Sequence, residues 1–136
     1  GDTERIHHYR TQARNLGVEN RCYFLGPQPV GLLDRLMQQA DIMLSPRTHG
    51  TNTPLKLYSY LDSGTPVVAT NLQTHTQVVS SNEAMLCEPN PADMAKAIGS
   101  LLDDAELSAQ LAANAKKLID EQIKSKSASG RRYHVQ

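Results

Sequence analysis

The feature that most constrains the fold is a set of short apolar runs, each followed by a segment with the period of an amphipathic helix. The runs at 41–45, 66–70 and 84–87 are too brief for helices and are apolar at successive positions. Helical periods fill 32–40, 54–63 and 91–102, and a helical turn is expected near 75–80. Strands that alternate with helices predict an α/β fold, in which helices flank both faces of a parallel sheet.

The two ends of the chain extend this pattern. Apolar residues at Ile6, Tyr9 and Ala13 predict a first helix that Gly17 ends. The run "RCYFLG" at 21–26 is expected to be another buried strand. From Asp104 onward an alanine-rich segment predicts a last helix, whose polar end either frays or docks on another domain. We expect one domain over residues 1–120, with 121–136 as the end of this helix or a tail.

Charge and hydropathy exclude several classes of function. Fourteen basic and fourteen acidic residues cancel, so no global field attracts nucleic acid, and any anion site must be local. No apolar run has the roughly 20 residues of a spanning helix, and the first residues do not resemble a signal peptide, which predicts a cytoplasmic protein. Cys22 and Cys87 are expected to be buried free thiols. No residue grouping has metal-ligand spacing, so neither a metal nor another cofactor is expected.

The loop "SPRTHGTNTP" between the run at 41–45 and the helix at 54–63 is the candidate binding site. Ligands of open parallel sheets bind beyond the carboxyl ends of the strands, where such loops lie. Thr53 is suited to the N-cap and Pro54 to the first helical position, which leaves the first helix amides free for a phosphate. Arg47 and Lys56 add positive charge, and Gly50 permits close backbone approach. The alternative is that Thr53 simply caps a helix and that Arg47 is a solvated loop residue.

Three segments carry a resemblance to a known family: "ADIMLSPR", "TPLKLYSYLDSGTPVVATN" and "AMLCEPNPADMAKAI". In this order and spacing they resemble the C-terminal, donor-binding domain of the retaining GT-B glycosyltransferases of family 4, the glycosyl transferases group 1. The resemblance implies a three-layer Rossmann-like sheet, with residues 1–120 as a partial nucleotide-sugar-binding domain. It also implies an N-terminally truncated domain of a bacterial enzyme of polysaccharide biosynthesis, which is inactive without an acceptor-binding N-terminal domain. The parent enzyme would transfer a sugar from a nucleotide diphosphate sugar to a glycan or lipid-linked acceptor.

The resemblance also assigns site residues. Family members carry two glutamates, with seven residues between them, on the transferred sugar and on the ribose. The matching positions here are Thr51 and Ser59, which are not acidic but can still hydrogen-bond hydroxyl groups. The loop that contains His75 borders the cleft in the family. No catalytic residue is assigned, and the expected donor-binding residues are Arg47, Gly50, Thr51, Asn52, Thr53, Pro54, Leu55, Lys56, Ser59 and His75.

Alternatives remain open for the function and for further contacts. The alternative function is a non-catalytic α/β binding module of flavodoxin-like or receiver-like type, although the acidic cluster typical of receivers is missing. His49 and Glu88 are either exposed turn residues or donor contacts. The basic C-terminal segment is either a solvated face or a surface weakly attracted to an anionic membrane at the cytoplasmic side. We also expect the isolated chain to form a homodimer.

Overall fold

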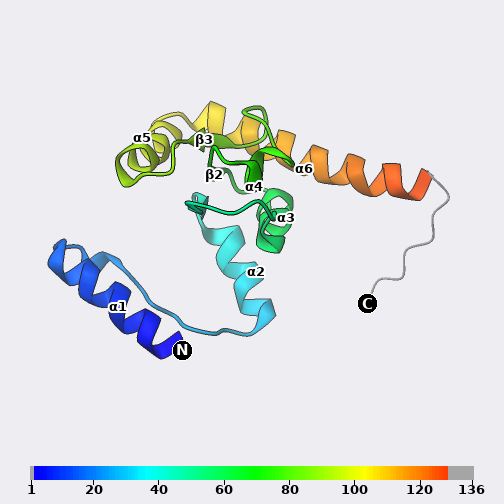
Figure 1. Cartoon of the computed structure of the whole chain (residues 1–136). Coiled ribbons are helices and arrows are strands. Elements are labelled where there is room, and N and C mark those ends of the chain that lie inside the picture. Colours follow the sequence, from blue (N-terminus) through cyan, green and yellow to red (C-terminus); the bar gives the residue numbers. More distant parts are fainter. Residues whose placement is uncertain (1, 129–136) are drawn as a thin grey trace. The chain divides into compact units, whose positions relative to one another are not determined.

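The computed structural model describes residues 2–128 and divides the chain into two compact units, 1–33 and 34–136 (Figure 1). The last helix, α6 (Ala105–Ala128), continues without a break past residue 121, from which we expected either the end of this helix or a tail. Its apolar stripe is followed by lysines, glutamates and serines, none of which breaks a helix. The rest of the predicted tail, 129–136, lies outside the described residues.

The first unit contains α1 (Asp2–Asn15) and a 3-10 turn, η1 (Glu19–Arg21). Gly17 ends α1 as predicted, because its φ of 74° is one that glycine adopts without strain. The amide of Gly17 donates to the Arg14 carbonyl, and the amide of Val18 donates to the Ala13 carbonyl at 2.9 Å. These two bonds form a Schellman cap, which pairs carbonyls at the end of the helix.

The strand predicted at 21–26 is wrong, and so is the prediction that Cys22 is buried. Residues 22–26 form neither a helix nor a paired strand, Cys22 is exposed, and the Tyr23 side chain is 86% exposed. An isolated apolar run becomes a strand only when a neighbouring strand satisfies its backbone, and the described residues of this unit offer none. The helix α1 is also largely polar, and among its residues 3–15, whose burial the structure describes, Ala13 alone is buried.

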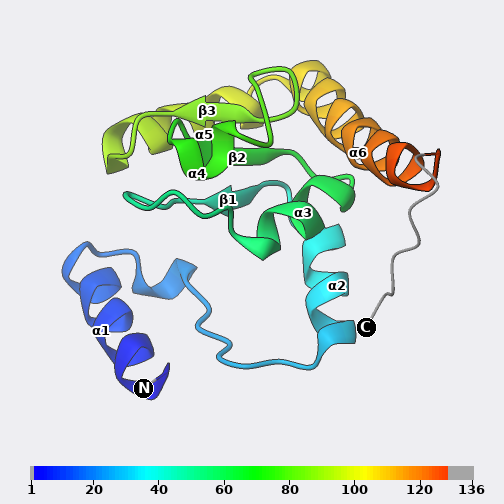
Figure 2. The ribbon, with the colours of Figure 1, turned by 45° about the vertical axis from the view of Figure 1, so that its right-hand side comes forward.

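The second unit is built around three parallel strands in the order β1-β2-β3, which Figure 2 shows side by side. They are β1 (Met43–Ser45), β2 (Val67–Thr70) and β3 (Met85–Cys87), and they confirm the three strands predicted in this region. Register pairs Ser45 with Ala69 and Thr70 with Cys87, so all three strands end at one rim. This arrangement confirms the predicted α/β class.

The helices from residue 30 onward agree with the sequence pattern, except at α4, and the first of them crosses the boundary between the two units. They are α2 (Val30–Gln39), α3 (Leu55–Asp62), α4 (Gln73–Thr76), α5 (Pro91–Leu102) and α6. The bounds of α5 are those predicted, because Asn90 caps it by accepting the amide of Asp93 at 2.9 Å. The predicted turn near 75–80 begins earlier, since the extended backbone of Leu72 forms the N-cap of α4.

Two apolar clusters lie on opposite faces of the sheet. Along β2, Val67 and Ala69 point to the cluster that contains Leu57 and Leu61 of α3 together with Ala115 and Ile119 of α6. Val68 points to the other cluster, with Ala97 and Leu101 of α5 and Leu111 of α6. This alternation is the period of a strand that is covered on both faces. Among the described residues, no helix combines the length and apolar character needed to cross a bilayer.

Candidate functional site

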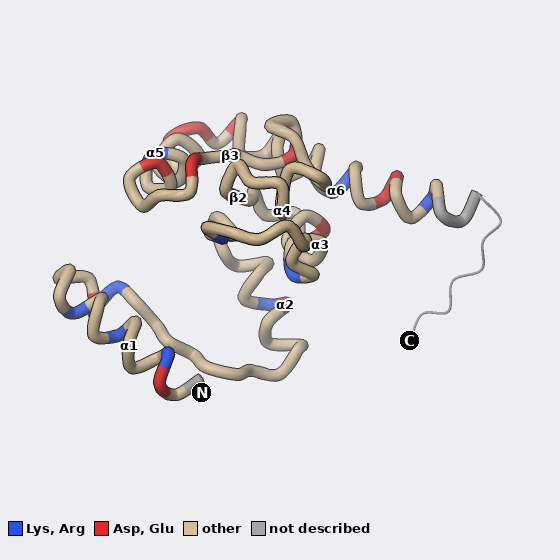
Figure 3. The backbone as a smooth tube through the Cα atoms, in the orientation of Figure 1, with Lys and Arg blue, Asp and Glu red and all other residues tan. Residues whose placement is uncertain are grey.

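The site lies at the rim where the parallel strands end. Ser45, Thr70 and Cys87 are the last residues of β1, β2 and β3. The loop of residues 46–54, which we call the β1–α3 loop, leaves this rim and leads into α3. Charged residues are sparse around the strands and their connections (Figure 3). Between Asp41 and Asp62 the charged side chains are those of Arg47 and Lys56, so this stretch is locally basic in a chain of zero net charge.

The N-terminus of α3 differs from the prediction by one residue. Pro54 is the N-cap, with an extended ψ of 132°, and the helix begins at Leu55. Thr53, the predicted cap, does not cap the helix, because its hydroxyl oxygen accepts a hydrogen bond from Gln77 Nε2 instead. Proline has no side-chain oxygen, so no side chain caps α3. The amide of Leu57 donates to the Pro54 carbonyl at 3.0 Å, and the amides of Leu55 and Lys56 have no side-chain cap. This arrangement keeps the positive end of the helix dipole available to an anion.

Most of the predicted donor-binding residues are exposed around this helix start. Thr53 and Pro54 are half-buried, whereas Lys56 and Ser59 are exposed and Leu55 is 84% exposed. The structure brings together the loop residues of the set and the first turn of α3. Ser59 lies on α3 one turn beyond Leu55, which places it away from the loop itself.

Arg47 lies against the loop that follows it. Its Nη1 is 3.4 Å from the carbonyl oxygen of Asn52, a long and weak hydrogen bond. Gly50 has a φ of 107°, and a Cβ built there would stand 3.5 Å from Nη1 of Arg47. The glycine therefore lets the loop turn back over the guanidinium, which stays exposed to solvent on its other side.

Side chains from the end of β2, from α4 and from its C-terminal cap donate hydrogen bonds to this loop. The hydroxyl of Thr70 donates to the Arg47 carbonyl at 2.7 Å, and the hydroxyl of Thr74 donates to the Asn52 carbonyl. The side-chain amide nitrogen of Gln77, Nε2, donates to the Thr51 carbonyl at 2.9 Å and also to Thr53 Oγ1. No local pattern in the sequence indicates these contacts, which join residues more than twenty positions apart.

His75 was expected to contact the donor, but its side chain is fully buried. Its Nδ1 donates to the Thr70 carbonyl at 2.8 Å, and in the neutral ring Nε2 is then the acceptor for the Ser45 hydroxyl at 2.7 Å. Both ring nitrogens are therefore engaged within the chain. The ring connects α4 to the ends of β1 and β2 and presents no surface to a ligand.

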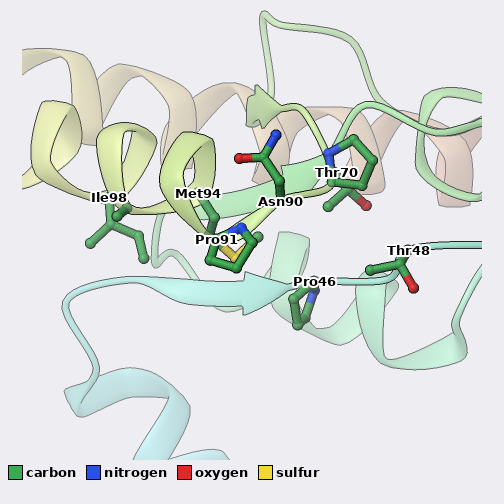
Figure 4. Close-up of a pocket in the computed structure, with 9 residues that line it drawn as sticks. Pro46, Thr48, Thr70, Asn90, Pro91, Met94 and Ile98 are labelled. Atoms are coloured by element: carbon green, nitrogen blue, oxygen red, sulfur yellow. The ribbon is translucent and has the colours of Figure 1, made fainter. Parts of the chain in front are cut away.

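A pocket of about 380 Å³ opens on the same rim, on the face of the sheet covered by α5. Figure 4 shows Pro46, at the end of β1, on one side of it and Met94 and Ile98 of α5 on the other. None of the ten predicted donor-binding residues lines it. The remaining lining residues are Thr48, Thr70, Pro89, Asn90, Pro91 and Ala95. Prolines after β1 and β3 were visible in the sequence, but only the fold shows that they face one another.

The structure also places three other titratable residues near the rim, His49, Glu88 and Cys87. His49 is exposed, with Nδ1 at 3.2 Å from the neighbouring Thr48 hydroxyl. Glu88 is exposed and lines a shallow hollow with Asp93 and Lys96. Burial raises the pKa of the Cys87 thiol, and the nearby carboxylates of Asp93 and Glu88 raise this pKa further. Among residues 2–128, no three side chains of metal-binding type gather into a site.

Comparisons with known proteins place this geometry in context. The family described as "Glycosyl transferases group 1" matches residues 1–118. D-inositol 3-phosphate glycosyltransferases from Corynebacterium glutamicum and Corynebacterium efficiens are 35% and 34% identical over 100 residues. Each match covers 72% of this chain, which spans 24% and 23% of those two proteins.

Solved structures of other proteins have a similar fold. The crystal structure of Anabaena HepE in complex with UDP-glucose has a TM-score of 0.78 and 24% identity, and covers 95% of this chain and 38% of that one. The C-terminal domain of LpcC, a glycosyl transferase group 1 family protein from Francisella tularensis, has a TM-score of 0.75 and 18% identity. That match covers 90% of this chain and 64% of the other. At these identities the likeness establishes the fold.

Proposed function

Since the chain belongs to the glycosyl transferases group 1 family, we propose that its β1–α3 loop and the start of α3 bind the diphosphate of a nucleotide-sugar donor. The observation that carries this proposal is the N-terminus of α3, which has no side-chain cap and lies at the carboxyl rim of the sheet, with Arg47 in the loop before it and Lys56 in its first turn. Helix amides and fixed cations stabilise negative charge at such a place. This membership favours the transferase over a non-catalytic binding module.

The chemistry that this site serves follows from where charge develops. When a sugar leaves its nucleotide diphosphate, negative charge grows on the leaving phosphate while the sugar becomes oxocarbenium-like. Hydrogen-bond donors and cations that are already in place around the phosphate stabilise this charge in the transition state more than they stabilise the bound substrate. Arg47 supplies a planar cation with several donors, and Lys56 a mobile point charge. Loop and helix therefore act by positioning and electrostatics, without a covalent step.

The finer assignment is to retaining transfer of the family 4 type. Thr51 and Ser59 take the positions at which that family carries two glutamates, and they offer neutral hydroxyls to the sugar and the ribose. A hydrogen bond to a neutral hydroxyl is weaker than one to a carboxylate, so we expect weaker donor binding than with glutamates at these positions. Glycosyltransferases are found among the relatives, and Anabaena HepE binds UDP and UDP-glucose. UDP is therefore the first nucleotide to test.

The chain spans about a quarter of the length of the curated relatives that it matches. We propose that an acceptor-binding domain supplies the opposite wall of the cleft and that the acceptor is a glycan or a lipid-linked sugar. The donor itself serves as substrate, and we assign no metal or other cofactor. The homodimer, the weak attraction to an anionic membrane and the cytoplasmic location stay predictions.

Calorimetric titration with UDP, GDP and ADP tests the proposal. We expect one of the three to bind, and Arg47→Ala and Lys56→Ala each to weaken that binding about tenfold, as loss of a charged hydrogen bond does. Lys117→Ala removes the same charge from an exposed position of α6 and should leave the affinity unchanged. A chain that is folded by circular dichroism but binds none of the three nucleotides would refute the proposal.

A further inference from the structure

The β1–α3 loop is held in one conformation by side chains that a ligand on the exposed side does not need to touch. Thr74 and Gln77 belong to α4 and its C-terminal cap, and both donate to carbonyl oxygens of the loop. Thr74 is fully buried, whereas Gln77 is exposed. The carbonyls that they bind belong to Asn52 and Thr51, which are adjacent in the chain.

Fixing two successive carbonyls also fixes the direction of the amides that follow them. The described residues contain no cis peptide bond. In a trans peptide the N–H points opposite to the C=O of the same plane. Because the carbonyls of Thr51 and Asn52 point toward Thr74 and Gln77, the amides of Asn52 and Thr53 point away from α4.

A second contact prevents the loop from rotating about this attachment. Gln77 Nε2 also donates to Thr53 Oγ1, so one amide group bonds the loop at two points, and the hydroxyl that it holds is the one the sequence suggested as a helix cap. Removing Thr53 from the cap position leaves the first turn of α3 open to a ligand. The contacts of Thr74 and Gln77 therefore orient the loop amides and also leave the N-terminus of α3 without a side-chain cap.

We propose that Thr74 and Gln77 are positioning residues for the donor diphosphate, which they affect through the β1–α3 loop rather than by contact. This inference rests on the proposed function, because it takes the ligand to be the diphosphate that binds the loop. A preorganised loop loses little entropy when the ligand binds, so its affinity depends on these distant hydroxyl and amide groups. A loop freed from α4 must be ordered by the ligand itself.

Two matched variants of Thr74 separate the hydroxyl from the packing. Thr74→Val keeps the shape and removes the donor to the Asn52 carbonyl, whereas Thr74→Ser keeps the donor. We expect UDP, or whichever nucleotide the parent chain binds, to bind Thr74→Val about three- to tenfold more weakly, the range of one net hydrogen bond. Thr74→Ser should restore affinity to within about twofold of the parent.

Gln77 provides a test that does not disturb the core, because its side chain is exposed. Gln77→Met keeps an unbranched side chain of similar length without a donor, and we expect the same loss of affinity. Gln73→Met is the control, since Gln73 is an exposed glutamine on the same helix with no side-chain hydrogen bond observed in the described residues. Melting temperatures of all variants are measured to show that each remains folded.

Backbone order parameters of residues 50–53 from nitrogen relaxation, measured without ligand, give the second readout. We expect values near 0.85 in the parent and a fall toward about 0.6 in Thr74→Val and Gln77→Met. If the parent binds a nucleotide and Thr74→Val and Gln77→Met bind it equally well, the positioning role is refuted while the proposed function stands. If the parent binds no nucleotide, the proposed function and the positioning role are both refuted. The order parameters then show only whether Thr74 and Gln77 keep the loop in one conformation.

Discussion

The imidazole Nε2 of His75 lies 2.7 Å from the hydroxyl oxygen of Ser45, thirty residues earlier in the chain. The same ring bonds the end of β2 through the Thr70 carbonyl. One buried side chain thus links α4 to the ends of two neighbouring strands, at the rim where the β1–α3 loop begins.

Removing the Ser45 hydroxyl should destabilise the fold. Ser45→Ala leaves a nitrogen of the buried His75 ring without its partner, which costs about 1–3 kcal/mol. Ser100→Ala is the control, because the Ser100 hydroxyl bonds the Lys96 carbonyl on an exposed helix surface and its loss should cost less than about 0.5 kcal/mol. Urea unfolding measures both values, and equal costs would show that the buried bond adds nothing.

Two glycine substitutions should change stability in opposite directions. Gly50→Ala forces a side chain onto a backbone with a φ of 107° and should cost about 1–3 kcal/mol. Gly99→Ala, within α5, meets no atom within 4 Å and should stabilise by about 0.4–1 kcal/mol. Thermal unfolding of the two variants gives the signs. A Gly50→Ala variant as stable as the parent would mean that the β1–α3 loop is not fixed in this conformation.

The two faces of α3 should respond differently to truncation. Leu57→Ala removes a fully buried side chain from the cluster shared with α6 and should cost about 2–5 kcal/mol. Leu55→Ala changes a residue that is 84% exposed on the same helix and should change the free energy of unfolding by less than about 0.5 kcal/mol. Comparable losses at both positions would place α3 in a different orientation from the one described.

The two cysteines should differ in reactivity. Cys22 is exposed, whereas Cys87 is buried and its pKa is raised, first by burial and then by Asp93 and Glu88. Since the thiolate is the reactive form, a disulfide reagent at pH 8 should label Cys22 rapidly and Cys87 slowly until urea is added. Rapid labelling of both thiols in the folded protein would contradict the burial of β3.

The raised pKa of Cys87 also predicts a dependence of stability on pH. The folded state holds the neutral thiol to higher pH than the unfolded state does, so this contribution is fully present below the unfolded pKa of about 8.5. It is lost as the pH rises from there through the folded pKa. The free energy of unfolding should decline over this range, and Cys87→Ala should decline less steeply than Cys22→Ala.

Much of the fold could be predicted because the relevant signals are local. The run that became β2 needed no knowledge of its neighbours, and the Asn90 and Pro91 pair marked the start of α5 within its own few residues. The run at 22–25 is also apolar, yet Tyr23 is exposed, because pairing depends on a partner strand that composition does not specify. Local pattern thus identifies the propensity for a strand, and tertiary context decides whether it forms.

The position of the candidate site could be predicted from the sequence, but the contacts that hold its loop could not. A polar loop between an apolar run and a helix located the β1–α3 loop, and the position of Pro54 located the start of α3 to within one residue. The contacts of Thr74 and Gln77 with that loop span 22 and 26 positions, and nothing in either segment alone points to the other. His75 showed the same limit, since a polar stretch gave no sign that its ring is fully buried.

An amide-resolved NMR titration decides whether the loop amides and the first turn of α3 bind a nucleoside diphosphate. UDP, GDP and ADP are added in turn to the labelled chain, and we expect one of them to shift the amide signals of Asn52, Thr53, Leu55 and Lys56 in a saturable way. Saturable shifts confined to other parts of the chain, with these four amides unmoved, would show that the nucleotide binds elsewhere.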